Sequence, residues 1–279
     1  MNKICIAGGG TMGSGIAQVC AMAGYSTLLY DLQEEVLKKA KQKINADLDK
    51  LVEKEKITAI EKEEALGKLR FSNSMADCSA DMVIEAIIEK MEAKTGLFDQ
   101  LAALNTEQTI FASNTSSLSI NAIAHHIPGP QRFAGLHFFN PAPVMKLVEV
   151  VKGEQTSEAT IHALVEFTRK LGKQPVICKD SPGFIVNRVA RPFYIESLRI
   201  AEEGLADYAT IDTILEKVGF KMGPFKLMDL IGNDVNYAVS CSVYEQLNKP
   251  ERLKPSYLQE EKVKQGQLGK KTKKGYYDY

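Results

Sequence analysis

The sequence predicts an α/β protein in which a doubly wound, mostly parallel sheet is followed by an all-helical C-terminal domain. Short apolar runs alternate with amphipathic helical segments up to about residue 180, and such alternation is typical of βαβ units around a parallel sheet. Beyond that point apolar residues recur only at helical spacing. The change of pattern predicts two domains, residues 1–180 and 181–279.

Seven short apolar runs are expected to form strands, because buried parallel strands are almost continuously apolar. They are residues 3–8, 26–31, 82–86, 110–113, 132–138, 147–151 and 175–179. Helices are expected at 13–23, 91–104, 117–125 and 156–171, with one long amphipathic helix and a further short one within 33–70. Five more are expected at about 184–204, 210–218, 224–231, 234–247 and 256–266, and Pro182 lies where the first of these could begin.

The charge balance and the cysteines restrict the class of protein. Lys and Arg together number 35, as do Asp and Glu, whereas a protein that mainly binds nucleic acid usually has a basic excess. No apolar run is long enough to span a membrane, and no leader-like segment precedes the first strand. The five cysteines are scattered, and no His/Cys spacing suggests a metal. We therefore expect a cytoplasmic protein without a metal.

Residues 8–13, GGGTMG, form a glycine-rich turn between the first expected strand and the first expected helix. At this place Gly8 permits a tight turn, Gly10 lets the backbone approach a pyrophosphate, and Gly13 allows close helix–strand contact. The N–H groups of the helix start, at Thr11 and Met12, then face the phosphates. This context favours a Rossmann-type dinucleotide site. A turn that binds nothing, or a site for FAD, is the alternative.

Asp31 ends the second expected strand, 18 residues after Gly13. A carboxylate at this position can accept hydrogen bonds from the hydroxyls of the adenosine ribose. It would also repel the additional phosphate of NADP, and no arginine follows it, since the next residues are Leu32 and Gln33. We therefore expect NAD as the cofactor.

His137 is the candidate general base among the four histidines. Hydride loss from a carbinol carbon needs a group that takes the hydroxyl proton, and histidine is the most common such base near neutral pH. His125 and His126 lie beside a loop-like IPGP stretch, and His162 falls within an expected helix. His137 instead ends the strand RFAGLHF, and the carboxyl ends of strands in an open α/β sheet face the ligand crevice.

Glu149 is the expected partner of His137. If the chain folds back through the turn after residue 137, a pairing symmetric about Pro143 places the two residues opposite each other. A carboxylate inside the apolar run LVEVV needs a partner, and it would fix the imidazole tautomer and stabilise the imidazolium. The alternative is a buried structural pair without chemistry.

Two polar groups are further candidates for ligand contact. The run SNTSS, residues 113–117, follows an expected strand, and Asn187 lies in the otherwise apolar segment PGFIVNRVA. The alternatives are a helix N-cap for the serine and threonine run, and a capping or surface amide for Asn187.

Five ordered segments resemble the 3-hydroxyacyl-CoA dehydrogenases, specifically the short bacterial 3-hydroxybutyryl-CoA dehydrogenases. They are GGGTMGSGIA, SNTSSLSI, GLHFFNPAPVMKLVEVV, DSPGFIVNR and MGPFKLMDLIG. The resemblance extends over essentially the whole chain, to the closing GKKTKKGYYDY. It implies NAD-dependent interconversion of (S)-3-hydroxybutyryl-CoA and acetoacetyl-CoA. It also implies a homodimer formed through the helical domain.

The resemblance implies a role for each candidate residue. His137 is expected to be the general base and Glu149 its orienting partner. The substrate's 3-oxygen is expected to accept hydrogen bonds from Ser116 and Asn187. The expected cofactor contacts beyond the glycine turn and Asp31 are Glu89, Lys94, Ser116, Asn140 and Lys271.

The CoA moiety is expected near the long charged helix, residues 33–55, where Lys54 could meet a CoA phosphate together with Lys50 and Lys56. A run of this kind is more often a solvated helix face. The chain departs from the family pattern at Gly9, Lys226 and Asn233. Two other classes remain open: a dehydrogenase of free 3-hydroxyacids, which would carry a catalytic lysine where this chain has Asn187, and a non-catalytic NAD-binding relative.

Overall fold

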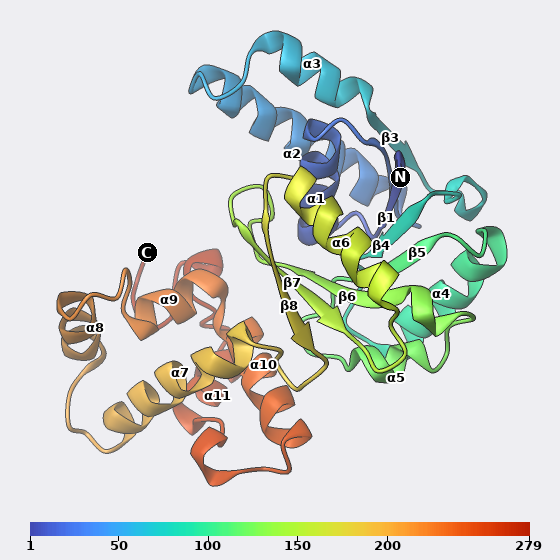
Figure 1. The fold of residues 1–279 in the computed structure, drawn as a ribbon. Coiled ribbons are helices and arrows are strands. Elements are labelled where there is room, and N and C mark those ends of the chain that lie inside the picture. The colour runs from blue at the N-terminus through green and yellow to red at the C-terminus, as the bar shows by residue number, and fades with distance from the viewer. The chain divides into compact units, whose positions relative to one another are not determined.

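The computed structural model describes residues 1–279, which divide into two compact units, Met1–Asp180 and Ser181–Tyr279 (Figure 1). The first unit combines a sheet with helices, and the second is helical. Each unit has its own cluster of buried apolar side chains. The predicted fold class is confirmed.

One eight-stranded sheet forms the centre of the first unit, in the order β3-β2-β1-β4-β5-β6-β7-β8. The strands are β1 (Lys3–Ala7), β2 (Ser26–Tyr30), β3 (Leu69–Ser72), β4 (Met82–Glu85), β5 (Ile110–Ser113), β6 (Phe133–Phe138), β7 (Leu147–Lys152) and β8 (Gln174–Lys179). β1 to β6 are mutually parallel, and β7 is antiparallel to β6 but parallel to β8. The chain therefore reverses direction once within the sheet, between β6 and β7.

Helices cover both faces of this sheet (Figure 1). They are α1 (Thr11–Met22), α2 (Glu34–Glu53), α3 (Ala59–Gly67), α4 (Met91–Leu104), α5 (Ile120–Ala124) and α6 (Glu158–Lys170), with short 3-10 turns η1 (Met75–Asp77) and η2 (Pro130–Arg132). Apolar residues of α1 and α6 share one core with Leu136 and Phe138 of β6. Phe98 of α4 packs edge-on against Phe133 of β6, with ring centroids 5.1 Å apart. Since neighbouring strand residues point to opposite faces, α4 lies on the face opposite to α1 and α6.

β3, the strand at one edge of the sheet, was not predicted from the sequence. Only helices were expected within residues 33–70, and α2 and α3 do lie there. β3 has four residues, LRFS, none of them fully buried. An edge strand of this kind lacks the continuous apolar run that marks a buried parallel strand. The start of α3 is fixed by a reciprocal cap, in which Thr58 Oγ1 accepts from the Glu61 N–H at 3.1 Å and Glu61 Oε2 from the Thr58 N–H at 2.7 Å.

The second unit contains five α-helices (Figure 1). They are α7 (Val186–Glu202), α8 (Tyr208–Lys217), α9 (Pro224–Ile231), α10 (Asn233–Gln246) and α11 (Tyr257–Lys264), with 3-10 turns η3 (Glu251–Leu253) and η4 (Lys270–Thr272). The expected helix start near Pro182 is wrong, because Gly183 and Phe184 both have positive φ angles, 74° and 49°, which no α-helix tolerates. Helix α7 therefore begins after this turn.

Two buried aspartates hold the C-terminal tail of the second unit. The carboxylate of Asp229, in α9, accepts from the backbone N–H groups of Tyr276 and Tyr277, each at 3.0 Å. The carboxylate of Asp212, in α8, accepts from the Tyr277 hydroxyl at 2.7 Å. A Cβ on Gly275 would lie 2.0 Å from Asp229 Oδ1, so the tail approaches this carboxylate as closely as only glycine allows.

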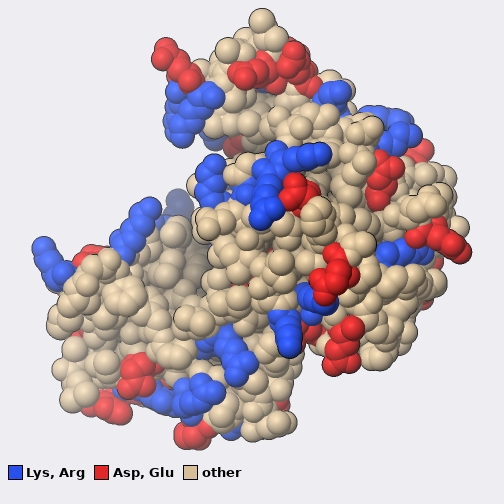
Figure 2. All heavy atoms as spheres, in the orientation of Figure 1, with Lys and Arg blue, Asp and Glu red and all other residues tan.

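The surface carries charges of both signs. Figure 2 shows Lys and Arg interspersed with Asp and Glu on the face that it draws. None of the helices is both long and apolar enough to cross a membrane.

Candidate active site

His137 and Glu149 form a buried pair across the β6–β7 hairpin. The antiparallel register places them directly opposite each other, as the pairing about Pro143 predicts. His137 Nδ1 lies 2.7 Å from Glu149 Oε2, and the two residues are only 5% and 1% exposed. The expected partnership is confirmed as a contact.

The pair points away from the core that α1 and α6 share with the sheet. Leu136 and Phe138, which flank His137, belong to that core, so the alternation of the strand directs His137 to the other face. The end of β6 is fixed by Asn114, whose Oδ1 accepts from the Phe138 N–H at 2.8 Å. Asn114 belongs to the run 113–117 that the sequence marked as a candidate for ligand contact, but no role of its own was predicted for it.

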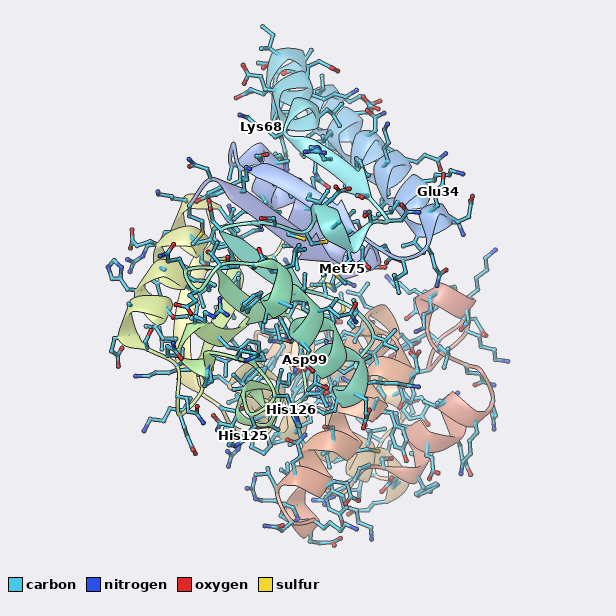
Figure 3. All side chains as sticks on the ribbon, turned by 90° about the vertical axis from the view of Figure 1, so that its right-hand side faces the viewer. Glu34, Lys68, Met75, Asp99, His125 and His126 are labelled. Atoms are coloured by element: carbon cyan, nitrogen blue, oxygen red, sulfur yellow. The ribbon has the colours of Figure 1, made fainter.

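The other histidines lie at the surface. His125 and His126 follow α5 (Figure 3). Both are exposed, and so is His162 on α6. Only His137 is buried, and only His137 has a carboxylate within salt-bridge distance.

The glycine turn joins β1 directly to α1 and has the shape that the sequence predicts. Gly8 has φ 111°, and its N–H donates to the Tyr30 carbonyl at 2.8 Å. A Cβ on Gly13 would lie 1.7 Å from the Gly8 carbonyl oxygen. Only glycine at position 13 therefore allows the helix to approach the turn this closely. A Cβ on Gly10 would meet nothing within 4 Å. The space beside Gly10 and the absence of a side-chain cap on α1 suit a pyrophosphate at this helix start.

Asp31 lies directly after β2 and is bonded to the glycine turn. Its Oδ2 accepts from the Gly9 N–H at 2.7 Å, and its Oδ1 accepts from the Gln33 N–H at 2.9 Å. The carboxylate therefore lies at the carboxyl end of β2 beside the turn, where a ribose-binding acid is needed. Its contact with a ribose stays a prediction.

Lys94 lies between two carboxylates at the carboxyl end of β4. Its Nζ is 2.5 Å from Glu85 Oε1 and 3.2 Å from Glu89 Oε2. Lys94 and Glu85 are 1% and 0% exposed, and Glu85 Oε2 also accepts from the Ser113 hydroxyl at 2.6 Å. Burial raises the pKa of Glu85, while the Lys94 charge and these hydrogen bonds act against that rise. Sequence reasoning missed Glu85, although an acid at the end of the apolar run MVIEA was the same kind of signal as Glu149.

Glu89 holds the loop that contains Ser116. Its Oε1 accepts from the backbone N–H groups of Ser116 and Ser117, at 2.9 and 3.1 Å, and from the Thr115 hydroxyl at 2.6 Å. Desolvation acts to raise the pKa of Glu89, but the Lys94 charge and the bonds from Thr115 and Ser116 together lower it. The structure thus brings Glu89, Lys94 and Ser116 into one network. Their contacts with a cofactor stay predictions.

The remaining predicted residues belong to other elements of the chain. Asn140 is exposed in the loop after β6, and Lys54 is exposed directly after α2. Asn187 and Lys271 belong to the second unit. Asn187 lies in the first turn of α7, and Lys271 Nζ is 2.5 Å from Asp234 Oδ1. The expected ligand contacts of these four residues stay predictions.

The two units match the two domain models of one enzyme family. Residues 3–181 match "3-hydroxyacyl-CoA dehydrogenase, NAD binding domain", and residues 183–279 match "3-hydroxyacyl-CoA dehydrogenase, C-terminal domain". The chain is 50% identical over 281 residues to the 3-hydroxyadipyl-CoA dehydrogenase of Escherichia coli strain K12, with 100% of this chain but only 59% of that protein covered. It is 44% identical over 288 residues to the mitochondrial hydroxyacyl-coenzyme A dehydrogenase of Rattus norvegicus, covering 100% of this chain and 91% of that one.

A solved structure extends this likeness to the fold. The crystal structure of (S)-3-hydroxybutyryl-CoA dehydrogenase from Ralstonia eutropha superposes with a TM-score of 0.96 at 39% identity, covering 100% of this chain and 99% of that one. The glycine turn, the acid after β2 and the sheet order agree with a domain that binds NAD. The chain therefore belongs to the 3-hydroxyacyl-CoA dehydrogenase family, and its first unit is the family's NAD-binding domain.

Proposed function

We propose that the chain catalyses the reversible oxidation of (S)-3-hydroxybutyryl-CoA to acetoacetyl-CoA. The observation that carries the proposal is the buried contact between His137 Nδ1 and Glu149 Oε2, 2.7 Å long. It is the one buried histidine–carboxylate pair of the chain, and it lies at the carboxyl end of a strand in an NAD-binding sheet, where ligands of such sheets bind.

His137 serves as the general base of the oxidation. Its contact with Glu149 favours the tautomer that donates from Nδ1, so that Nε2 carries the lone pair and accepts the proton of the 3-hydroxyl group. The Glu149 carboxylate stabilises the imidazolium that results, and it holds the ring in place. In the reverse direction protonated His137 returns this proton to the 3-oxygen. NAD, when bound, supplies the acceptor for the hydride that leaves C3.

Ser116 and Asn187 are proposed to donate hydrogen bonds to the 3-oxygen. In the reduction they would stabilise the negative charge that develops on this oxygen. The position of Ser116 is supported by Glu89, which binds the Ser116 N–H at 2.9 Å. Asn140, Glu89, Lys94 and Lys271 are proposed to contact the cofactor, and Lys54 a phosphate of CoA.

The test is a spectrophotometric assay that follows NADH oxidation with acetoacetyl-CoA. Turnover with this substrate, together with its loss in His137→Gln, is the expected result. Turnover with free acetoacetate but not with its CoA ester would favour a free-acid dehydrogenase instead. NADH binding without turnover of either substrate would favour a non-catalytic relative.

The acyl group has a second candidate, because the E. coli relative at 50% identity is named a 3-hydroxyadipyl-CoA dehydrogenase. That name indicates a longer acyl chain that ends in a free carboxylate. Comparing kcat/KM for acetoacetyl-CoA, longer 3-oxoacyl-CoAs and 3-oxoadipyl-CoA decides between the candidates. A preference for 3-oxoadipyl-CoA would overturn the C4 substrate while keeping the reaction.

We further propose a cytoplasmic homodimer formed through the second unit. Large apolar side chains there are strongly exposed, among them Val189 at 72%, Leu205 at 71% and Val218 at 69%, and such side chains mark an interaction surface where they form a contiguous patch. All five cysteines are free thiols, which suits a reducing compartment. Light scattering coupled to gel filtration tests the assembly, and a monomer at micromolar concentration would contradict it.

A further inference from the structure

We propose that Lys173 is a positioning residue, whose buried ammonium group holds in place the loop that joins the strands of His137 and Glu149. This inference rests on the proposed function of that pair. Lys173 follows α6 and directly precedes β8. Nothing in its sequence context, LGKQPV, marks it as more than a lysine at a strand start.

The ammonium group binds three carbonyl oxygens of one loop. Lys173 Nζ donates to the carbonyls of Ala142 at 2.6 Å, Met145 at 2.7 Å and Pro143 at 3.3 Å. An ammonium group has three donors, and here all three go to the backbone between β6 and β7. No carboxylate lies within salt-bridge distance of Lys173, although it is only 8% exposed. Burying an ammonium group with only carbonyl partners costs free energy. Lys173 differs in this respect from an ordinary surface lysine.

The same loop is held from its other side by α1. A Cβ on Gly15 of α1 would lie 3.1 Å from Pro143 Cδ and 3.3 Å from Ala142 Cβ. Glycine at this position therefore lets the loop lie against the helix that starts at the glycine turn. Ala142 is buried in the core shared by α1 and the sheet. The loop is thus fixed between the cofactor-binding helix and the Lys173 ammonium group.

The position of this loop bears on the proposed acid–base pair. Residues 139–146 connect the strand of His137 to the strand of Glu149, and the loop begins with Phe139, whose ring centroid lies 4.5 Å from that of His137. Lys173 also lies beside the start of β7, since Gln174 pairs with Leu147. Removing the ammonium leaves three carbonyls without their donor and frees the loop to move. Displacement of a reacting group by about 1 Å can lower the rate on the order of a hundredfold.

The first test combines truncation with chemical rescue. Lys173→Ala is expected to lower kcat per folded enzyme roughly 10- to 100-fold, with the dissociation constant of NAD nearly unchanged. Ammonium chloride should restore part of the lost kcat, whereas sodium chloride at the same ionic strength should not. Lys173→Met should show the same loss without rescue, because its side chain fills the space that the lysine side chain occupies. Lys170→Ala, which removes an exposed lysine three residues away, is the matched control and should behave like the unchanged enzyme.

A second measurement follows the loop without using activity. The chain contains no tryptophan, so Val144→Trp, at a position 68% exposed, places a single fluorescent reporter in the loop. Adding Lys173→Ala to this variant should increase quenching by acrylamide, and ammonium should reverse the increase. This result would stand even if the unchanged enzyme did not reduce acetoacetyl-CoA, so failure of the proposed function and failure of the Lys173 proposal are distinguishable.

Three outcomes would overturn the proposal. The first is a folded Lys173→Ala variant with the kcat of the unchanged enzyme. The second is rescue by sodium as strong as rescue by ammonium, which would indicate a general salt effect. The third is equal quenching of the reporter with and without Lys173. If Lys173→Ala does not fold, the same reporter in the Lys173→Met background decides the question.

Discussion

In the proposed reaction Nδ1 of His137 contacts Glu149 and Nε2 accepts the proton of the 3-hydroxyl group. A glutamine side chain can replace neither nitrogen fully. His137→Gln keeps a polar side chain but removes the group that gains and loses a proton. We expect kcat to fall by a factor on the order of a hundred or more, while the dissociation constant of NAD stays nearly the same. Steady-state kinetics and NADH fluorescence titration measure the two quantities. His162→Gln, at an exposed position of α6, is the control, and full activity of His137→Gln would end the assignment.

Asp31 has two roles that one variant can separate. Its carboxylate binds the Gly9 N–H at 2.7 Å and is predicted to bind the ribose. Asp31→Ala should weaken NAD roughly 10-fold or more, since hydrogen bonds to charged groups contribute about 1.5–3 kcal/mol. Loss of the ribose contact should also reduce the preference for NAD over NADP. Equal weakening of both cofactors, measured by titration, would mean that only the turn was disturbed and that the ribose role is wrong.

Glu89 couples the stability of the first unit to pH. Its pKa is lowered below the ordinary value of 4.5, so the folded state holds this proton less tightly than the unfolded chain does. The ionised group therefore stabilises the fold above the unfolded pKa, and this contribution is lost as the pH falls through the folded value. Glu89→Gln should be less stable than the unchanged protein at pH 7, and the two should converge below pH 4.5. Urea unfolding at several pH values tests this, and a constant difference would contradict it.

The sequence predicted the His137–Glu149 contact because Glu149 interrupts the apolar run LVEVV and a pairing symmetric about Pro143 places it opposite His137. Glu85 breaks the run MVIEA in the same way, yet it was missed. Its partner, Lys94, lies on a helix rather than on a neighbouring strand, so no symmetric pairing pointed to it. Lys173 was missed for a related reason, since its partners are backbone carbonyls, which carry no residue-specific signal.

At the scale of elements, long periodic segments were predicted well and short or irregular ones were not. The buried strands and the helices with strong 3.6-residue periodicity appear close to their expected positions. β3 was missed because a half-buried edge strand of four residues has no distinctive pattern. The start of α7 was misplaced because a proline favours the first turn of a helix only when the residues that follow it adopt helical angles, and Gly183 and Phe184 do not.

The C-terminal tail is an element whose removal should destabilise the second unit. Deleting residues 275–279, which keeps Lys271, takes the Tyr276 and Tyr277 donors away from the buried carboxylates of Asp229 and Asp212. Each hydrogen bond to such a charged group contributes about 1.5–3 kcal/mol. We expect the deletion to lower the unfolding temperature of the second unit selectively. Scanning calorimetry measures this, with NAD affinity as the control, and an unchanged transition would contradict the role of the aspartates.

At the scale of the whole molecule, the two units should respond differently to the cofactor. A ligand that binds only the folded state stabilises it by about 2.7 kcal/mol at 100 times its dissociation constant. NAD should therefore raise the unfolding temperature through the first unit, and His137→Gln should keep this shift because the base is not needed for binding. Thermal unfolding monitored with and without NAD tests the expectation. A shift abolished by His137→Gln would place the histidine in the binding site rather than in the chemistry.

The single reversal of strand direction, between β6 and β7, has a consequence for how the enzyme can be altered. It places the proposed proton acceptor and its partner on one hairpin, twelve residues apart in the chain, whereas Asn187, the proposed donor to the 3-oxygen, belongs to the other unit. Under the proposed function, substitutions in the helical unit should change the acyl preference while leaving the acid–base equilibrium of the hairpin intact. Variants selected for a new acyl chain should keep the inflection points of the parent's pH–rate profile. The proposed acid–base pair would then depend on one contiguous segment of the chain, and the acyl preference on another.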